Sequence, residues 1–357
     1  MKVRTQISLS VLALAASAAS AQSSVTIYGI VDAGVEHLTN VGAGGNGLTR
    51  MPNLTGSVPS RIGFRGSEDL GGGLRALFNL ETGFSPESGV LNQGGRMFGR
   101  QSTVGLQSSW GTFTVGRQNT MLTFSLMDAD ILGPNIYGSS SLDSYVAGAR
   151  VDNSIGWRAS FSGVTLGATY SLGRDTTNCA GESGADSKAC REVSVLAKYD
   201  APAWGVAFAI DQLRGGTGGT GGLTSSTLTD KRSVVNGYFK AGATKVAAGL
   251  IRRNNEGSAA TPKSDLYWVG ASHPVTSLFT LDGQIFRLDF KNSANEATLF
   301  ALRGTYALSK RTAVYGTLGR IGNDGTLAIS ASGGAGGGAP AAGKSQTGVM
   351  FGVRHAF

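Results

Sequence analysis

Few residue patterns in this chain of 357 residues could support catalysis or metal binding. Its three histidines, His37, His273 and His355, are too scattered in the sequence to predict a metal site. No GxSxG, HExxH or CxxC motif occurs. GAGGNG at 42–47 fits GxGxxG, but no helix is expected after this glycine-rich loop, so it does not predict a nucleotide site. We therefore expect no enzymatic activity, no cofactor and no metal.

Fixed charges in an alternating pattern are the more informative chemistry. In the stretch SRIGFRGSEDLGGGLRALFNLETGF, residues 60–84, Arg61 and Arg65 alternate with Ile62 and Phe64. Period-2 alternation indicates a β-strand with two unlike faces. The stretch therefore predicts strands that have one charged and one apolar side.

The two cysteines also suggest a chemical role. Cys179 and Cys190 are eleven residues apart in a polar segment that we expect to be a loop. In an exported protein they would form a disulfide that closes this loop. A two-cysteine metal site is the weaker interpretation, because no histidine is nearby in the sequence.

The N-terminus has the pattern of a secretory signal peptide. Lys2 and Arg4 are basic, residues 7–16 are apolar, and Ala19-Ser20-Ala21 is a small-residue cleavage site. Cleavage after Ala21 would remove 21 of the 357 residues and leave a single domain of 336, residues 22–357. We find no later apolar run of the roughly 18 residues that a membrane helix requires.

Composition restricts the class of protein further. Glycine is very abundant at 55 residues, and the long apolar runs of buried parallel strands are missing. The formal charge of +8 becomes +6 when Lys2 and Arg4 are removed. Acidic residues are interspersed with the basic ones, and there is no block of lysine and arginine, so we do not expect nucleic acid as a partner.

Turn signals divide the chain after the signal peptide into alternating segments. Short connections are expected at 67–72, 108–111, 162–163, 201–205, 243–245, 274–277 and 308–310. Long connections rich in Gly, Ser and Asn are expected at 38–59, 85–97, 118–149, 172–191, 215–230, 254–264, 291–295 and 322–346. Seven short and eight long connections imply sixteen strands. Short turns at one end and long loops at the other are typical of an antiparallel outer-membrane β-barrel.

In such a barrel the apolar strand faces point outward into lipid. Only a closed barrel lets strands satisfy their backbone in the membrane, whereas a soluble sandwich would place these faces in one core. We expect aromatic side chains near the strand ends to form interfacial belts: Tyr28, Trp110, Tyr199, Trp204 and Phe357. The alternation is poor at 100–106, where Arg100 shares its expected face with Val104 and Leu106.

Five stretches resemble the general porins of Gram-negative bacteria, in particular the trimeric beta-proteobacterial branch. They are SSVTIYGIVDAGVE (23–36), residues 60–84, FGRQSTVGLQSSWGTFTVGRQ (98–118), RVDNSIGW (150–157) and GVRHAF (352–357). The resemblance implies an all-β, sixteen-stranded antiparallel transmembrane barrel, assembled as a homotrimer. The third long loop, 118–149, would fold into the lumen and constrict the pore.

The resemblance also implies a row of arginines on the barrel wall that faces acids of the inward loop. The "SR-apolar-GF" motif places Arg61 in this row, "FGRQ" places Arg100, and the arginine ahead of "NSI" is Arg150. We infer from its parity with Arg150 that Arg158 extends the row. Asp128 and Asp130 are the expected acids of the loop.

The C-terminal Phe357 is similar to the aromatic signal that the barrel assembly machinery reads. The resulting hypothesis is a water-filled outer-membrane channel for passive diffusion of ions and small hydrophilic solutes, mildly anion-preferring because arginines outnumber acids. Two alternatives stay open: a substrate-specific channel, and a surface adhesin or receptor that acts through its long loops. An enzyme built on a barrel wall is disfavoured, because no nucleophile–histidine arrangement is evident.

Overall fold

The computed structural model describes residues 24–54, 56–173, 179, 181–182 and 184–357. The predicted signal peptide, residues 1–21, lies outside the described residues. None of the helices in the described part is both long and apolar enough to cross a membrane.

The described residues form a nearly all-β structure in which seventeen strand segments follow one another along the chain. They are β1 (Ser24–Val41), β2 (Asn46–Arg50), β3 (Arg61–Gly71), β4 (Leu74–Gly83), β5 (Gln101–Ser108), β6 (Gly111–Asn119), β7 (Arg150–Phe161), β8 (Val164–Ser171), β9 (Glu192–Asp200), β10 (Trp204–Arg214), β11 (Thr229–Ala241), β12 (Thr244–Asn255), β13 (Lys263–Pro274), β14 (Phe279–Phe290), β15 (Glu296–Ala307), β16 (Thr312–Asn323) and β17 (Gln346–Ala356). The helical segments are short: α2 (Asn92–Gly95), α3 (Met121–Leu126), α4 (Ser139–Leu142) and the 3-10 turn η2 (Val146–Gly148).

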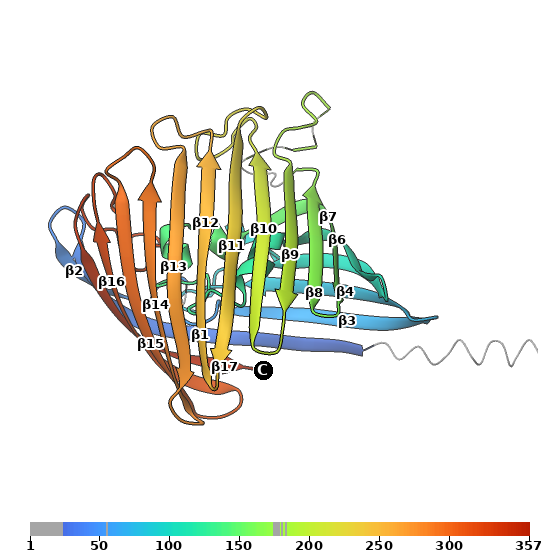
Figure 1. The fold of residues 1–357 in the computed structure, drawn as a ribbon, viewed down its shortest axis with the longest axis horizontal. Coiled ribbons are helices and arrows are strands. Elements are labelled where there is room, and N and C mark those ends of the chain that lie inside the picture. Colours follow the sequence, from blue (N-terminus) through green and yellow to red (C-terminus); the bar gives the residue numbers. More distant parts are fainter. Residues whose placement is uncertain (1–23, 55, 174–178, 180, 183) are drawn as a thin grey trace, which may run out of the picture.

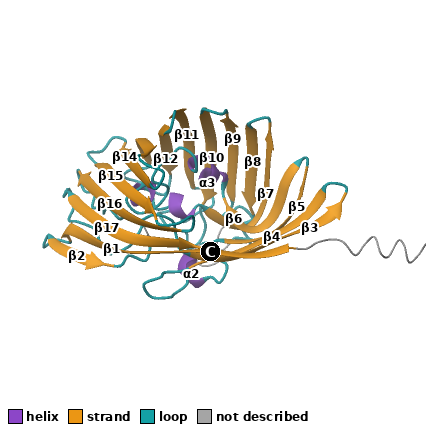
Figure 2. Cartoon of the chain, turned by 90° about the horizontal axis from the view of Figure 1, so that it is seen from below, coloured by secondary structure: helices purple, strands orange, loops and turns teal. Residues whose placement is uncertain are grey.

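The strands form one closed antiparallel barrel (Figures 1 and 2). From β3 to β17 each strand pairs with the next, and β1 closes the sheet by pairing with β17. β2 and β3 share one position in the barrel, because the C-terminal part of β1 pairs with β2 and its N-terminal part pairs with β3. The barrel therefore has sixteen strand positions, which confirms the predicted number, with the short and long connections in the predicted order.

One difference lies in the first long connection, which contains a hairpin. β1 continues to Val41 and returns as β2 through a turn in which Gly42 and Gly45 have φ of 67° and 64°. Glycine adopts this left-handed region without steric cost. The GxGxxG-like stretch at 42–47 therefore forms the tip of a hairpin.

The apolar strand faces point outward, as the alternation predicts. In β10, Val206 and Phe208 are exposed on the outer side, whereas Ala207, Ala209 and Asp211 are buried on the inner side. Such a surface is stable only in lipid, since a soluble protein rarely exposes large contiguous apolar patches. The exposed band therefore marks the part of the barrel that faces the membrane.

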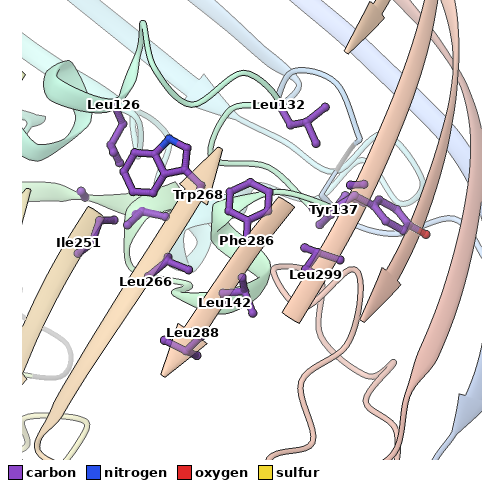
Figure 3. Close-up of a cluster of buried hydrophobic side chains, with 14 of the residues drawn as sticks. Leu126, Leu132, Tyr137, Leu142, Ile251, Leu266, Trp268, Phe286, Leu288 and Leu299 are labelled. Carbon is purple, nitrogen blue, oxygen red and sulfur yellow. The ribbon is translucent and has the colours of Figure 1, made fainter. Parts of the chain in front are cut away.

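The long connection after β6 turns into the barrel. Its helix α3 packs against β9, β10 and β11, and Figure 2 shows it inside the curve of the sheet. Loop side chains such as Leu126, Leu132 and Leu142 pack against wall residues that point into the lumen (Figure 3). These wall residues are Ile251, Leu266, Trp268, Phe286, Leu288 and Leu299. The side of the lumen next to these wall residues is thus filled by a hydrophobic core.

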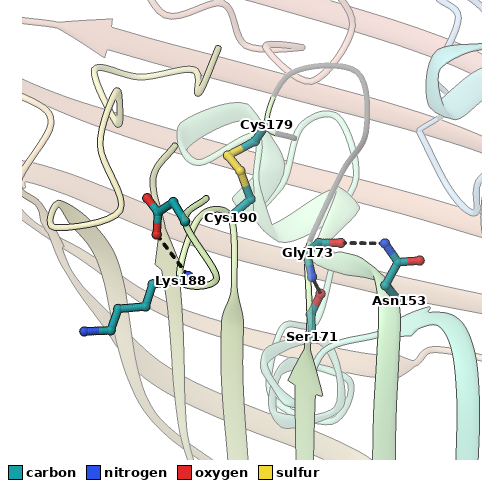
Figure 4. Close-up of a disulfide and its surroundings, with 7 residues drawn as sticks. Asn153, Ser171, Gly173, Cys179, Lys188 and Cys190 are labelled. Carbon is teal, nitrogen blue, oxygen red and sulfur yellow. Dashed lines mark hydrogen bonds between the residues drawn. A yellow bond between two sulfur atoms is a disulfide. The ribbon is translucent and has the colours of Figure 1, made fainter. Parts of the chain in front are cut away.

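The loop between β8 and β9 contains a disulfide between Cys179 and Cys190 (Figure 4). The backbone N–H of Cys190 donates to the carbonyl of Gly215 at 2.9 Å, which joins this loop to the neighbouring one. A Cβ on Gly216 would lie 2.7 Å from the Cys190 sulfur, so only glycine allows this close approach. At the foot of the loop, Asn153 and Ser171 bond to the main chain of Gly173.

Replacing both cysteines, Cys179→Ala with Cys190→Ala, should lower the free energy of unfolding by about 3 kcal/mol, because it restores the chain entropy of a short open loop. Denaturant titration followed by tryptophan fluorescence measures this change. Reduction of the unmodified protein should produce the same loss. An unchanged midpoint in both experiments would contradict the prediction.

Candidate functional site

Two of the predicted arginines share one carboxylate on the inner face of the wall. Arg100, just before β5, places its Nε 2.6 Å from the Glu81 carboxylate of β4. Arg61, the first residue of β3, places its Nε 3.4 Å from the other Glu81 oxygen. Glu81 is buried, and it is held from both neighbouring strand positions.

Tyr28 of β1 completes this group. Its hydroxyl donates to Glu81 at 3.0 Å and also lies 3.0 Å from Asn79. The expectation that Tyr28 belongs to an outward aromatic belt is therefore wrong. In β1 the even-numbered residues Tyr28, Asp32 and Glu36 face the lumen, so the parity of the strand outweighs its end position.

Arg150 lies beside this group at the start of β7 and is buried. Its electrostatic neighbours are Arg61, Arg100, Arg117 and Glu81. One Arg150 nitrogen lies 3.4 Å from the carbonyl of Ala147, and no ion pair of Arg150 is found among the described residues. The structure thus brings Arg61, Arg100 and Arg150 together around a single carboxylate, Glu81.

Arg158 lies apart from these three. Its guanidinium carbon is 3.9 Å from the centre of the Phe124 ring of α3, a cation–π contact. Arg158 therefore supports the inward loop rather than the arginine group.

Asp128 and Asp130 do not lie against the arginine group either. Asp128 forms an ion pair with Lys198 of β9, which also contacts Asp200 at 2.9 Å. Asp130 is buried and accepts a hydrogen bond from the Ser139 hydroxyl at 2.6 Å. Burial raises the pKa of the Asp130 carboxyl to about 6. Both acids are thus engaged away from Arg61, Arg100 and Arg150.

The third acid of the loop, Asp143, links the loop to the barrel wall. Its carboxylate accepts two hydrogen bonds from Arg232 of β11, at 2.7 and 3.1 Å. The Arg232 side chain is fully buried, and it also donates to Asp230 at 3.0 Å. A buried arginine requires hydrogen bonds to carboxylates, because these bonds offset the free-energy cost of removing its charge from water.

Tyr137 anchors the far end of the loop in a slot made by two glycines. A Cβ on Gly319 or Gly348 would lie 2.4 or 2.6 Å from Tyr137 atoms, so side chains there would exclude the ring. The Tyr137 hydroxyl donates to Glu36 of β1 at 2.8 Å, and Glu36 is 2.6 Å from Arg50. The inward loop is thus held at β1, β16 and β17 as well as at β9–β11.

A second segment enters the lumen between β2 and β3. In its described residues, 51–54 and 56–60, the carbonyl of Ser57 accepts a hydrogen bond from Asn135 of the inward loop at 2.7 Å. Arg303 of β15 donates to the carbonyl of Gly56 at 3.2 Å, and Arg354 of β17 donates to the Ser57 hydroxyl at 2.8 Å. The two segments therefore support each other.

Phe357 closes the last strand against the first. Its main chain exchanges hydrogen bonds of 3.0 and 3.1 Å with Gly29 of β1. A Cβ on Gly29 would lie 2.4 Å from the Phe357 ring, so a glycine is required at this position. The side chain itself is half exposed on the outer face.

Three residues that form ion pairs in the site were not identified from the sequence, namely Glu81, Lys198 and Arg232. Glu81 carries no motif, and nothing in the sequence pairs it with two arginines. Lys198 and Arg232 pair with loop acids that are 70 and 89 residues away in the chain. Strand register, if known, would have placed Glu81 level with Gly63 and Gln101 on the neighbouring strands.

The arrangement divides the lumen into two unlike halves. The loop and its apolar core lie against the wall from β9 to β16. In the wall from β3 to β7, Arg61, Arg100 and Arg150 lie around Glu81, and Arg117 of β6 pairs with Asp152 of β7. Arginines therefore outnumber carboxylates there, while the three loop acids are occupied elsewhere. Fixed positive charge on a hydrated surface of this kind attracts anions.

Comparison with known proteins relates the chain to one family. A sequence profile described as Gram-negative porin matches residues 8–326. The chain is 32% identical to outer membrane porin protein 32 of Delftia acidovorans, with 99% of each chain covered. It is 30% identical to an outer membrane porin protein of Bordetella pertussis, over 87% of this chain and 92% of that one.

The fold is also similar to a solved structure of an anion-selective porin from Comamonas acidovorans. The TM-score is 0.76 at 27% identity, and the match covers 94% of this chain and 100% of the other.

The Asp143–Arg232 link predicts how firmly the loop is attached. Asp143→Asn replaces the carboxylate that accepts two hydrogen bonds from Arg232 with a neutral amide. This change should lower the free energy that holds the loop to the wall by about 2 kcal/mol. Amide hydrogen exchange in residues 121–146 should then become about 30-fold faster.

Asp186→Asn, at an exposed aspartate of the loop before β9, is the matched control and should leave this exchange unchanged. Equal exchange rates in Asp143→Asn and the unmodified protein would show that the link does not hold the loop.

Proposed function

The chain belongs to the Gram-negative porin family, and we propose that its arginine group gives this outer-membrane channel a mild preference for anions. The observation that carries the proposal is the imbalance of charge beside β3–β7. Arg61, Arg100 and Arg150 face a single carboxylate, Glu81. The similarity to an anion-selective porin supports the same direction.

The physical basis is long-range attraction in a confined space. Arginine keeps its charge at every physiological pH, so the wall charge is permanent. Fixed charges in a narrow opening with low-dielectric walls concentrate counter-ions and discriminate against co-ions. The charged half of the lumen also orients dipolar solutes, while apolar solutes lose hydration there without gaining a partner.

Transport through such an opening is passive. Small hydrophilic solutes diffuse along the open half of the lumen, and no step requires a covalent change or a catalytic group. We accordingly assign the protein no enzymatic activity. The long loops face the outside of the cell and the short turns face the periplasm, as in barrels of this class.

Export and assembly complete the proposal. We propose that residues 1–21 are removed as a signal peptide and that residues 22–357 form the mature single-domain barrel. We also propose a homotrimer, and Phe357 as part of the signal for barrel assembly. Exposed apolar side chains beside α2, namely Val90, Leu91 and Met97, provide a surface that a neighbouring copy would cover.

Neutralising the arginines should reduce the preference for anions. A unit charge about 8 Å from an ion in water contributes about 0.5 kcal/mol, or about twofold in local concentration, so Arg61→Gln, Arg100→Gln and Arg150→Gln together should lower the anion-to-cation permeability ratio by about tenfold at low salt. Single-channel current in a planar bilayer under a salt gradient gives this ratio as a reversal potential.

Arg320→Gln is the matched control, because Arg320 is exposed on the outer face of β16. It should leave the reversal potential unchanged. The proposal fails if the triple variant also reverses at the unmodified potential. In the same recordings, closure in three equal steps would support the trimer, and single steps would contradict it.

Neutralising Glu81, the carboxylate shared by Arg61 and Arg100, should instead increase the preference for anions. Glu81→Gln leaves the three arginines in place and should raise the anion-to-cation ratio by about twofold, with a larger change at low salt than at high salt. Glu296→Gln, outside the lumen, serves as the control. A reversal potential that moves toward the cation side would contradict the assignment of Glu81 to the pore.

A further inference from the structure

The outer face of β11–β14 changes from apolar to charged at its long-loop end. Strand register arranges the outward residues in rows. One row contains the apolar residues Ala248, Val269 and Ile285. Two rows higher, Arg252 lies beside Asp265 and Asp289. This boundary is where the barrel leaves the hydrocarbon of the outer leaflet.

Above the boundary the outer surface is hollowed into a groove of about 490 Å³. Five cationic side chains line it: Lys231, Arg252, Arg253, Lys263 and Lys291. They come from β11, β12, β13 and the β14–β15 connection, so the folded sheet brings together residues that are distant in the sequence.

A buried carboxylate organises two of these cations. Asp265 accepts hydrogen bonds from Arg252 at 2.9 and 3.0 Å, and Lys291 lies 3.2 Å from it. The Asp265 side chain is only 2% exposed, whereas the Arg252 side chain is 66% exposed. Asp265 therefore holds the Nε and Nη2 side of the Arg252 guanidinium, and the remaining N–H groups face the outside of the barrel.

Of the remaining three cations, Arg253 pairs with a carboxylate of β11, whereas the two lysines have no acidic partner among the described residues. Among the described residues neither Lys231 nor Lys263 takes part in an ion pair, and both line the groove. Three carboxylates, Asp230, Asp265 and Asp289, pair with groove cations, which number five, so positive charge is in excess. Two lysines with uncompensated charge would be satisfied by an anion that binds between them.

We propose that this groove binds the phosphate groups of a phosphorylated lipid in the outer leaflet. Lys231, Lys263 and Arg252 would contact the phosphate, and the exposed apolar side chains below, such as Val235 and Val269, would contact the acyl chains. The proposal depends on the outer-membrane location of the barrel but not on its ion preference, because the groove lies on the opposite side of the wall from the lumen.

A lipid fits this surface better than free phosphate for a geometric reason. The cations lie directly above the apolar rows of the same strands, so one molecule with an anionic head and apolar tails can contact both. Free phosphate could use only the cations, which are open to water and therefore bind it weakly.

The test measures lipid bound to the folded, purified barrel. The protein is mixed in detergent with doubly phosphorylated lipid A, or with the same glycolipid after removal of its phosphates, and bound lipid is counted by native mass spectrometry. The unmodified protein should retain the phosphorylated lipid at least fivefold better than the dephosphorylated one. Lys231→Gln with Lys263→Gln should reduce that retention by about tenfold.

The matched control is Lys310→Gln with Arg311→Gln, which removes the same charge in the short turn between β15 and β16, where both side chains are exposed. It should retain the phosphorylated lipid as the unmodified protein does. Single-channel conductance identical to that of the unmodified protein verifies that both double variants are folded. Equal loss in both would show that only overall charge matters and would overturn the proposal.

Two further outcomes would also overturn it. Equal retention of the phosphorylated and dephosphorylated lipid would show that acyl chains alone are bound. Displacement of the lipid by an equimolar amount of inorganic phosphate would show that the groove is a site for free phosphate. A normal reversal potential together with lost lipid binding would separate this site from the channel function.

Discussion

Closure of the sheet is the constraint on which the rest of this structure depends. The hydrocarbon of a membrane offers no water to an unpaired backbone group, so every strand requires a partner on both sides. β1 meets that requirement by pairing with β17 from Ile30 to Leu38 and with β2 and β3 on its other edge. Where β2 and β3 leave a gap, side chains replace the missing strand: the Asp32 N–H donates to the Ser60 hydroxyl at 2.9 Å, and the Val58 N–H donates to the Asp32 carboxylate at 2.9 Å.

Closure leaves the lumen to be shaped by what enters it. A hydrated lumen normally calls for polar inner faces, yet Ile251, Trp268 and Phe286 are apolar and fully buried because the inward loop covers them. The indole N–H of Trp268 donates to the carbonyl of Ala129 at 3.0 Å, which satisfies a main-chain group of the loop. Hydrophobic packing thus fixes the loop on one side, and the charged wall from β3 to β7 stays in contact with water.

The barrel could be predicted from the sequence because period-2 alternation and turn length are local properties. The alternation predicted that Arg61 lies on the face opposite Ile62 and Phe64. It failed at Arg100, because Arg100 precedes β5 and its side chain does not follow the parity of Val104 and Leu106, which are exposed on the outside.

Pairing across the lumen could not be predicted, because it depends on contacts between distant parts of the chain. Asp143 and Arg232 are 89 residues apart, and their types alone do not distinguish them from other acids and arginines. The apolar inner faces of β13–β15 could not be predicted either, because strands that are apolar on both sides show no alternation of polar and apolar residues.

Residues 56–60 and the inward loop narrow the lumen with main chain, and their positions are fixed by contacts to β1, β15 and β17. The arginine group, by contrast, consists of side chains at the start of β3 and β7 and just before β5. The size limit and the charge preference of the opening are therefore encoded in separate parts of the molecule. A lineage of such barrels can change which solutes it favours by single substitutions on β3–β7, while the largest solute that passes stays the same.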